Sequence, residues 1–332
     1  MVGVEGLAVQ GAGEVVAHGG PDTLTGQDVR LKAPGPGEIL VRLAVAGVNF
    51  VDIYMRRGLK PVPPPFTPGL EGAGVVEAVG PGVSTVRPGD RVAYAQQIGA
   101  YAEATLVPAD SLIALPDDVS FELGAAFPLQ GMTAHYLIHE FRKPSEGDVV
   151  LVHAAAGGVG LFLVQWARHL GARVIGTVST REKAEAVRQA GADDVILYTE
   201  QDFAEETLRL TDGHGADLII DGVAATTFAG NLKAAALRGH IVIFGAAGGP
   251  ADPISPHVLM ELSLSLSGGD LWHFMRTHEE MLHRAGAVME GIEHGWLTPR
   301  ISRVLPLADA AEAHRLLEDR KTIGKILLAT GD

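Results

Sequence analysis

The stretch DVVLVHAAAGGVGLFLVQWARHLG, residues 148–171, decides the fold of this chain. It begins with the apolar run of a buried strand, passes through a turn of small residues, and continues with the pattern of an amphipathic helix. Ala155, Gly157 and Gly160 have the spacing of a dinucleotide-binding turn, with alanine in place of the first glycine. Such a turn lets backbone N–H groups at a helix N-terminus approach a pyrophosphate, whose negative charge the helix dipole favours. We therefore predict a nucleotide-binding strand–turn–helix; the alternative is that the glycines serve only close packing.

A membrane span is another interpretation of this stretch, because residues 149–167 contain no charged side chain. However, Gly157, Gly158 and Gly160 lie within four residues, and His153 and Gln165 interrupt the apolar run. A continuous lipid-facing helix accommodates these residues poorly, so we predict a buried element of a globular protein without a membrane partner.

Composition limits the classes of function that are open to the chain. Its 332 residues suffice for two domains, and 47% hydrophobic with 20% charged residues is typical of a globular protein. The net charge of −14, without a cluster of lysine and arginine, argues against nucleic acid as a partner. No secretory signal follows Met1, so we expect a cytoplasmic protein.

Metal ligands are the next question. The chain contains no cysteine, which removes disulfides, thiolate metal ligands and a cysteine nucleophile together. The spacing of His135 and His139 places two imidazoles on one helical face, as in some metal sites. Because no third ligand lies nearby in the sequence, we interpret both as ordinary histidines on a helix surface and predict no metal site.

The rhythm of the sequence changes near residue 145. Before it, short β segments separated by Gly and Pro turns predict a compact antiparallel or barrel-like domain. After it, strands and helices alternate, which predicts a parallel sheet with helices on both faces. The early strands are EILVRLAVAGV (38–48), GAGVVEAVG (72–80) and DRVAYA (90–95); the later ones are VVLVHA (149–154), RVIGTV (173–178), DDVILY (193–198), ADLIID (216–221), HIVIFG (240–245) and LSLSLSGG (262–269).

Helical segments fill the spaces between the later strands, and a mixed tail follows them. The expected helices are REKAEAVRQAG (181–191), EQDFAEETLRLTDG (200–213) and AATTFAGNLKAAALRG (224–239), each ending at Gly. The tail comprises a helix near residues 276–290, a strand at 301–307, a helix at 307–320 and a final strand at 324–330. We expect this tail to fold back onto the first domain.

The end of the second parallel strand indicates which cofactor binds. Enzymes that select NAD place a carboxylate there to bind the ribose 2′-hydroxyl. No Asp or Glu closes the strand RVIGTV; instead Ser179, Arg181 and Lys183 offer a hydroxyl and two cations to a 2′-phosphate. We predict NADPH rather than NADH. The alternative is that Arg181 and Lys183 are solvated charges at a helix start.

Many short motifs in a fixed order then resemble one known family. The motifs are GGPDTL (19–24), APGPGEILV (33–41), GVNFVDIYMRRGL (47–59), PGLEGAGVVEAVG (68–80), RPGDRVAY (87–94), GAYAEATLVPA (99–109), residues 153–177 of the turn region, GADDVILY (191–198) and GKILL (324–328). They resemble the zinc-independent quinone oxidoreductases, the ζ-crystallin-like branch of the medium-chain dehydrogenase/reductase superfamily.

The resemblance implies an α/β fold in which a GroES-like β-rich catalytic domain is joined to a doubly wound parallel Rossmann domain. We expect the catalytic domain at residues 1–127, the NADP-binding domain at 128–268, and a segment completing the catalytic domain at 269–332. The resemblance also implies an active site in the cleft between domains and homodimers formed through the edge strand 262–268. An exposed alternating edge strand fits this, since it otherwise invites uncontrolled pairing; the alternative is a monomer whose edge a loop covers.

Site residues are transferred from the family position by position. Asn49 and Tyr54 match its polar active-site pair, although Asn49 also suits a turn and Tyr54 a half-buried packing position. Asp52 between them suits a solvated or capping carboxylate. The positions that match cofactor contacts are Thr133, Gly157, Gly158, Val159, Gly160, Ser179, Arg181, Lys183, Tyr198, Phe244 and Gly245.

Some positions depart from related sequences. Zinc-dependent relatives carry a histidine before the glutamate where this chain has Leu70 and Glu71, so zinc chemistry lacks its ligands here. Gln130 stands where some relatives have lysine, and GGDLWHF (268–274) differs from the usual segment. These last departures concern substrate preference.

The implied function is hydride transfer from NADPH to a quinone or another electron-poor conjugated carbonyl. Asn49 would donate a hydrogen bond to the developing oxyanion, and Tyr54 would either donate a hydrogen bond to it or deliver a proton, directly or through water. One alternative is a reductase of enones or enoyl thioesters on the same scaffold. An alternative of another class is a non-catalytic NADPH-binding structural or regulatory protein.

Overall fold

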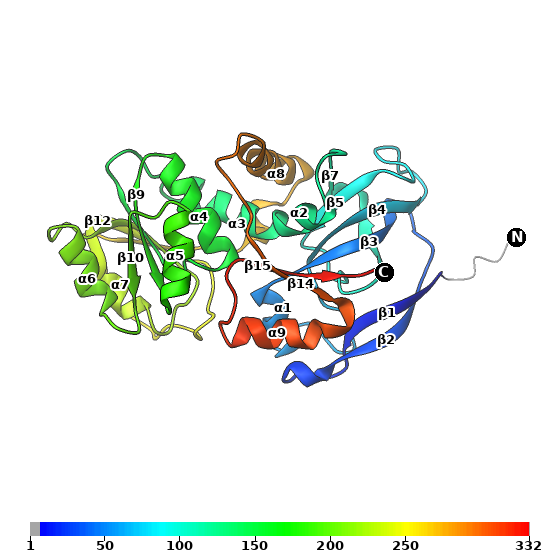
Figure 1. Cartoon of the computed structure of the whole chain (residues 1–332), viewed down its shortest axis with the longest axis horizontal. Helices are drawn as coiled ribbons and strands as arrows, with labels where there is room; N and C mark the ends of the chain where they lie inside the picture. Colours follow the sequence, from blue (N-terminus) through cyan, green and yellow to red (C-terminus); the bar gives the residue numbers. More distant parts are fainter. Residues whose placement is uncertain (1–6, 332) are drawn as a thin grey trace, which may run out of the picture. The chain divides into compact units, whose positions relative to one another are not determined.

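The computed structural model describes residues 7–331, which form two units (Figure 1). Unit 1 combines residues 1–129 with residues 301–332, and unit 2 spans residues 130–300. Unit 2 is therefore inserted into the sequence of unit 1. Within the described residues, none of the helices is both long enough and apolar enough to cross a membrane.

Unit 1 is built on a seven-stranded sheet that is mostly antiparallel. Its strands are β3 (Glu38–Val48), β4 (Glu71–Val79), β5 (Arg91–Ala95), β6 (Ala104–Pro108), β7 (Leu112–Ala114), β14 (Ile301–Pro306) and β15 (Lys325–Ala329). The order is β14-β15-β3-β4-β5-β7, and β6 pairs with β3. Only β14 and β15 pair in parallel. The two C-terminal strands thus join the sheet formed by the N-terminal part of the chain, as the sequence predicts for the end of the tail.

A hairpin and three short helices complete unit 1. The hairpin of β1 (Leu7–Val15) and β2 (Leu24–Leu31) is tied to the rest of the unit by backbone bonds from Gly13 to Tyr101 and from Val15 to Phe66. The helices are α1 (Phe50–Arg56), α2 (Phe121–Ala126) and α9 (Ala310–Glu318), with the 3-10 turns η1 (Pro21–Thr23), η2 (Ala109–Ser111) and η5 (Leu307–Asp309). Valines and isoleucines of the sheet pack with Ala310 and Ala313 of α9 in one core.

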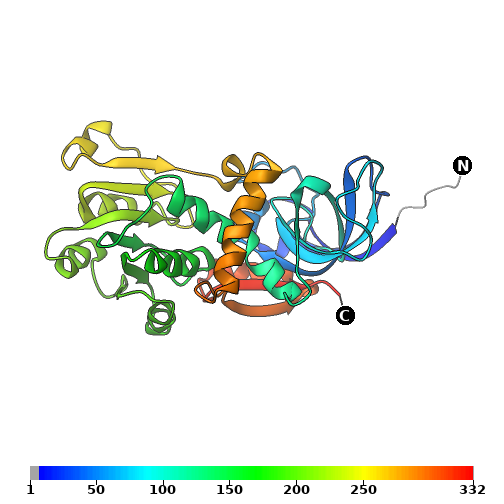
Figure 2. The same cartoon turned by 90° about the horizontal axis from the view of Figure 1, so that it is seen from above.

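Unit 2 is a doubly wound parallel sheet, which confirms the predicted α/β fold class. Its strands are β8 (Val149–Val152), β9 (Arg173–Val178), β10 (Asp194–Leu197), β11 (Ala216–Asp221), β12 (Ala235–Ile243) and β13 (Ser265–Gly268), in the order β10-β9-β8-β11-β12-β13. All neighbours pair in parallel. In Figure 2 the strand β13 lies at one edge of this sheet.

Both faces of the parallel sheet are buried, which explains the continuous apolar runs of its strands. Leu151, Ile175 and Ile219 face a cluster that includes residues of α6 and α7. Because side chains alternate along a strand, neighbouring residues such as Val150 and Val174 face the opposite side. The helices of unit 2 are α3 (Pro128–His139, whose first two residues belong to unit 1), α4 (Gly158–His169), α5 (Arg181–Gln189), α6 (Phe203–Leu210), α7 (Phe228–Ala234) and α8 (His278–Glu293), with the 3-10 turns η3 (Pro256–Met260) and η4 (Leu271–Phe274).

Two expected elements differ from the observed ones. The helix predicted over residues 224–239 was wrong in its second half, because α7 ends at Ala234 and β12 begins at Ala235. Ala235 pairs with Ala216 of β11, and this pairing outweighs the helical propensity of the alanine run. The strand expected over 262–269 is shorter, since β13 starts at Ser265.

Residues 269–300 group with unit 2 rather than with unit 1. The reason is the packing of α8 against α3. A Cβ atom on Gly131 would lie 2.8 Å from a Val288 methyl, so the two helices are in close contact there. Arg284 of α8 also reaches Nδ1 of His135 at 2.9 Å.

Candidate active site and cofactor site

In unit 2, the turn of small residues within the stretch 148–171 joins β8 to α4. Gly157 is the N-cap of α4 and adopts extended backbone. A Cβ atom on Gly160 would lie 2.5 Å from the carbonyl oxygen of Ala154 and 2.7 Å from Cα of Ala155. Because both neighbours are backbone atoms, only glycine fits at residue 160, and the helix packs closely on the strand. A Cβ atom on Gly158 would meet Oε1 of Gln130 at 1.8 Å.

Three predicted 2′-phosphate contacts lie together where β9 and β10 end. Leu197 pairs with Val178, so the residues that follow them, Tyr198 and Ser179, leave the same edge of the sheet. Nζ of Lys183 lies 3.4 Å from Oγ of Ser179. The arrangement offers hydroxyl groups and an ammonium, which are the groups that bind a phosphate.

Arg181 is placed differently from Lys183. Its side chain is 85% exposed and stands 3.8 Å from the carboxylate of Glu200. The N-cap Thr180 accepts from the backbone N–H of Lys183, which fixes the start of α5. Lys183 is thus better held than Arg181 for contact with a bound group.

The other predicted cofactor residues of unit 2 follow from the strand order. Phe244 and Gly245 come directly after β12, and a Cβ atom on Gly222 would lie 2.8 Å from the Phe244 ring. Val159 lies in the first turn of α4, and Thr133 is buried in α3. Ligands of open α/β sheets bind outside the carboxyl ends of the strands, at the point where the strand order reverses. In this sheet that point lies between β8 and β11.

Asn49 lies in unit 1 as the N-cap of α1. Asp52 accepts from the backbone N–H of Asn49 at 2.8 Å, and the two residues form a capping box. The carboxylate of Asp52 is therefore a cap, but it is buried and not solvated. This corrects one of the two interpretations of Asp52 left open by the sequence.

The carboxamide of Asn49 is held by a buried ion pair that the sequence analysis missed. Nδ2 of Asn49 donates to Oε1 of Glu71 at 2.6 Å, and Oδ1 accepts from Nζ of Lys325 at 2.8 Å. Lys325 and Glu71 also contact each other directly, with side chains 1% and 0% exposed. Oε2 of Glu71 accepts from the backbone N–H of Leu129 at 2.8 Å. The orientation of the Asn49 amide is fixed by these partners.

A second buried series of polar groups starts at Asp52. The hydroxyl of Tyr101 donates to Oδ2 of Asp52 at 3.0 Å, and Nε2 of His314 lies 3.0 Å from the same hydroxyl. Arg56 reaches Nδ1 of His314 at 3.4 Å and pairs with Glu318 at 2.7 Å. Since arginine only donates, Nδ1 of His314 accepts and Nε2 carries the hydrogen toward Tyr101.

Burial is the main cause of the shifted pKa values of Asp52 and His314. It raises the pKa of Asp52 to about 7, although the bonds from Asn49 and Tyr101 and the charge of Lys325 oppose the shift. It lowers the pKa of His314 to about 3, with Arg56 acting in the same direction. His314 is thus neutral near pH 7, which agrees with its hydrogen-bond pattern.

Tyr54 lies half-buried on α1, two residues beyond Asp52. Its ring contacts that of Phe50 edge-on, with centroids 5.4 Å apart. Residues two apart on a helix point to different sides, so the Asp52 carboxylate is not aimed at Tyr54. Packing and a polar role for the hydroxyl are both compatible with this position.

His135 is not a surface histidine, contrary to the interpretation from the sequence, whereas His139 is half-buried. His135 is buried in unit 2, its ring is 4.6 Å from that of His139, and His283 of α8 comes within 5.4 Å. Burial lowers the pKa of His135 to about 3 and that of His139 to about 4. Arg284 donates to Nδ1 of His135, so Nε2 carries the hydrogen and cannot ligate a metal. Across residues 7–331, no group of three potential ligands is arranged to hold a metal ion.

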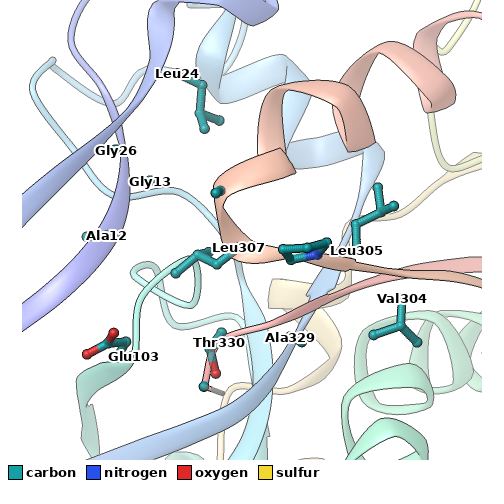
Figure 3. A pocket seen from close by; sticks show the side chains of 13 residues that line it. Ala12, Gly13, Leu24, Gly26, Glu103, Val304, Leu305, Leu307, Ala329 and Thr330 are labelled. Carbon is teal, nitrogen blue, oxygen red and sulfur yellow. The ribbon is translucent and has the colours of Figure 1, made fainter.

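Unit 1 also contains an open groove of about 570 Å³ between the β1–β2 hairpin and the β14–η5 connection (Figure 3). Its lining includes the apolar side chains of Leu24, Leu305 and Leu307 and the carboxylate of Glu103. The lining includes none of the predicted site residues. The groove is therefore separate from the candidate site.

A GroES-like unit and a Rossmann unit with a dinucleotide turn define the class of medium-chain dehydrogenases and reductases. Comparison with known families agrees with this class. Residues 35–117 match the family described as "Alcohol dehydrogenase GroES-like domain", and residues 158–285 match the family described as "Zinc-binding dehydrogenase".

Individual relatives are similar over nearly the whole chain. A quinone oxidoreductase of Pseudomonas aeruginosa is 41% identical over 318 residues, covering 95% of this chain and 98% of the relative. A 2-haloacrylate reductase of a Burkholderia species is 42% identical over 322 residues, covering 93% of this chain and 96% of the relative. The crystal structure of Escherichia coli quinone oxidoreductase complexed with NADPH matches with a TM-score of 0.93 at 37% identity, covering 97% of this chain and 100% of that one. The chain belongs to the quinone oxidoreductase family of the medium-chain dehydrogenase/reductase superfamily.

Proposed function

We propose that the protein is an NADPH-dependent oxidoreductase that delivers a hydride to a quinone or another electron-poor conjugated carbonyl. The observation that carries the proposal is the group of Ser179, Lys183 and Tyr198 at the end of β9 and β10, beside the dinucleotide turn. Family membership supports it, since one relative is a quinone oxidoreductase solved with NADPH. The experiment is steady-state oxidation of NADPH, followed by its absorbance, with quinones, enones and enoyl thioesters side by side. Binding of NADPH without turnover of any acceptor would favour a regulatory protein instead.

The chemistry divides between cofactor and protein. NADPH would supply a hydride, which is one proton together with two electrons, when it is bound. The acceptor gains these and becomes an anion, which takes one proton to give the neutral reduced product. We assign Tyr54 to supply that proton, directly or through water, and Asn49 to donate a hydrogen bond to the developing oxyanion. Glu71 and Lys325 hold the Asn49 amide for this role.

We also propose that the reaction proceeds without zinc. The sequence has no cysteine, and Leu70 precedes Glu71 where zinc-dependent relatives have histidine. Glu71 is instead paired with the ammonium of Lys325. A cation in this position opposes a divalent metal ion nearby.

Replacing Tyr54 with phenylalanine tests its assignment. We expect kcat/KM to fall about tenfold or more with an enone, because the enolate needs an acid. The loss should be smaller with a quinone, whose reduced anion is stable enough to take protons from solvent. Tyr136→Phe, which removes a hydroxyl from a buried tyrosine of unit 2, is the control. If Tyr54→Phe and Asn49→Ala both leave kcat/KM within about twofold for every acceptor, the assigned roles are wrong.

Replacing Lys183 with alanine tests the choice of cofactor. A hydrogen bond to a charged group contributes about 1.5–3 kcal/mol, so we expect kcat/KM with NADPH to fall roughly 10- to 150-fold. The value with NADH should change little, because NADH lacks the 2′-phosphate. Lys233→Ala on α7 removes another lysine of unit 2 and should leave both values unchanged. Equal use of both cofactors by the unaltered protein would contradict the assignment.

A second candidate substrate class is favoured by one comparison. The 2-haloacrylate reductase at 42% identity carries the name of a conjugated carboxylic acid as its substrate. A 2-haloacrylate, like an enone or enoyl thioester, presents an electron-poor carbon–carbon double bond. Comparing kcat/KM for 2-chloroacrylate, a crotonyl thioester and a benzoquinone separates reduction of this bond from quinone reduction.

We propose a homodimer formed through β13. This strand is the edge of the parallel sheet of unit 2, and Leu266 on it is 38% exposed. Met260 just before it is 73% exposed. Pairing with a second copy would cover both the apolar side chains and the strand edge. Sedimentation should show a dimer that Leu266→Asp shifts toward monomer, whereas a monomeric unaltered protein would refute the proposal.

The cytoplasmic location and the absence of a nucleic-acid partner stay predictions from the sequence.

A further inference from the structure

Unit 2 contains a buried hydrogen-bond relay that the mechanism above does not use. The relay consists of His153, Asn231 and Asp221, whose side chains come from the end of β8, from α7 and from the end of β11. Nε2 of His153 lies 2.7 Å from Oδ1 of Asn231, and Nδ2 of Asn231 donates to Oδ2 of Asp221 at 2.7 Å. All three residues are at most 3% exposed. Three separate elements are thus joined through polar groups inside an apolar sheet.

All hydrogen bonds of the relay are donated in the same direction along the chain of side chains, toward Asp221. The Asp221 carboxylate only accepts, so Asn231 turns its amide hydrogens toward it and its oxygen toward His153. His153 must then carry its hydrogen on Nε2, and Nδ1 accepts from the hydroxyl of Thr177 at 2.9 Å. Burial lowers the pKa of His153 and keeps the ring neutral, although Asp221 and Asn231 act the other way. Every member except the carboxylate both donates and accepts.

Each end of the relay meets a strained turn. His153 directly precedes Ala154, which has a φ of +49°. Oδ1 of Asp221 accepts from the backbone N–H of Ala224 at 3.1 Å, and Ala224 has a φ of +67°. A left-handed conformation costs a non-glycine residue about 1–2 kcal/mol, so the surrounding contacts must hold it. One end of the relay therefore bonds the backbone of Ala224, and the other end directly adjoins Ala154 in the chain.

These turns flank the place where the strand order reverses. From β8 the sheet continues through β9 and β10 on one side and through β11, β12 and β13 on the other. The turn at Ala154 leads into Gly157 and Gly160 of the dinucleotide loop, and the turn at Ala224 follows the neighbouring strand. A dinucleotide binds in the crevice outside these two strand ends.

We propose that His153, Asn231 and Asp221 are positioning residues for NADPH. The relay holds the loops after β8 and β11 in the shape that receives the cofactor before it binds. This inference rests on the proposed function, because it takes NADPH as the ligand of the crevice. A relay that only stabilises the core would affect folding and leave the affinity of the folded protein for the cofactor unchanged.

Asn231→Leu breaks the central link with little change in side-chain volume. We expect the Kd for NADPH, measured by calorimetry on folded protein, to rise about tenfold or more. The kcat at saturating NADPH should stay within about twofold, since the relay does not touch the acceptor. Thr207→Val is the matched control, because it also removes a buried polar group of unit 2, a hydroxyl bonded to the carbonyl of Phe203, and should leave Kd unchanged.

Ala154→Gly tests the link to backbone strain. Glycine adopts positive φ without the cost that alanine bears, and the side chain of Ala154 is exposed, so no packing is lost. We expect this substitution to recover part of the affinity lost in Asn231→Leu. In the otherwise unaltered protein it should change Kd by less than about twofold. Equal effects in both backgrounds would contradict the role of the relay in holding the turn.

Asp221→Asn tests the direction of the relay, and it does so even if Asn231→Leu does not fold. An amide at 221 can donate to Asn231, which then flips and donates to His153, so the whole relay reverses. The hydroxyl of Thr227 donates to Oδ2 of Asp221 at 2.6 Å. It can accept from the new amide instead, because its own hydrogen has a second acceptor in the carbonyl of Ala224 at 3.2 Å. Nitrogen-15 NMR of His153 should show the hydrogen on Nε2 in the unaltered protein and on Nδ1 in Asp221→Asn, with Kd within about threefold.

The outcomes separate the two proposals. If the unaltered protein does not bind NADPH, the proposed function fails, and the positioning role fails with it. If it binds NADPH and a folded Asn231→Leu binds equally well, the proposed function stands and the positioning role is wrong. If Asp221→Asn leaves the hydrogen on Nε2, the directional relay is wrong.

Discussion

Lys325→Met is expected to lower the free energy of unfolding by about 3–5 kcal/mol, the cost of removing one partner from a buried ion pair. Glu71 would keep its hydrogen bonds from Asn49 and Leu129 but would lose the positive charge that balances it. Because neither side chain reaches solvent, water cannot take the place of the ammonium. Chemical denaturation at pH 7 measures the change.

Two further variants show whether the charge is the cause. Glu71→Gln combined with Lys325→Met removes both charges and should recover at least half of the loss, since replacing a whole buried pair is often close to neutral. Lys321→Met removes an exposed lysine that pairs with Asp319 and should cost less than about 1 kcal/mol. A single variant Lys325→Met that unfolds within about 1 kcal/mol of the unaltered protein would contradict this account.

Gly160→Ala is expected to have a large effect on the affinity for NADPH. Its methyl group would lie 2.5 Å from the carbonyl oxygen of Ala154, so α4 must move away from the turn. Overpacking of this kind costs about 1–3 kcal/mol. If the cost falls on the loop that receives the pyrophosphate, Kd rises roughly 5- to 150-fold by the relation between free energy and affinity.

A glycine with open space around it gives the matched control for this prediction. Gly286 lies in α8 of the same unit, and nothing stands within 4 Å of a Cβ atom there. Gly286→Ala should stabilise the helix by up to about 1 kcal/mol and leave Kd unchanged. Calorimetric titration with NADPH compares the two variants, and equal Kd values for both would contradict the requirement for glycine at 160.

The fold of unit 2 could be predicted from the sequence because its signals are local. Apolar runs bounded by turns mark buried parallel strands, and β9 and β11 have the predicted bounds. The same local signals fail at Ala235, where an alanine-rich helical pattern belongs to a strand. Its pairing with Ala216 is a contact between distant residues, which no short window of sequence contains.

Some features of the candidate site are likewise readable from a short stretch of sequence, whereas others depend on contacts between distant residues. The placement of Ser179 and Lys183 after the end of β9 could be predicted, because it is readable from a few neighbouring residues. Their contact with the cofactor stays a prediction. The pairing of Glu71 and Lys325 could not be predicted, since 254 positions separate them and each stands in an otherwise apolar segment. Lys325 at the start of the apolar strand KILLA was the available signal, because an isolated charge in a buried strand requires a partner. The partners of His153 likewise lie 24 and 78 residues away.

The insertion of unit 2 into unit 1 has a consequence for biosynthesis. A nascent chain presents all of residues 130–300 to solution before β14 and β15 are translated. Unit 2 can therefore complete its sheet first. Val48 of β3 can pair with Ile326, and Glu71 with the ammonium of Lys325, only after β15 has been translated. The codons for residues 301–331 thus complete a domain whose first strands left the ribosome long before, and products truncated ahead of them would keep an exposed edge of β3.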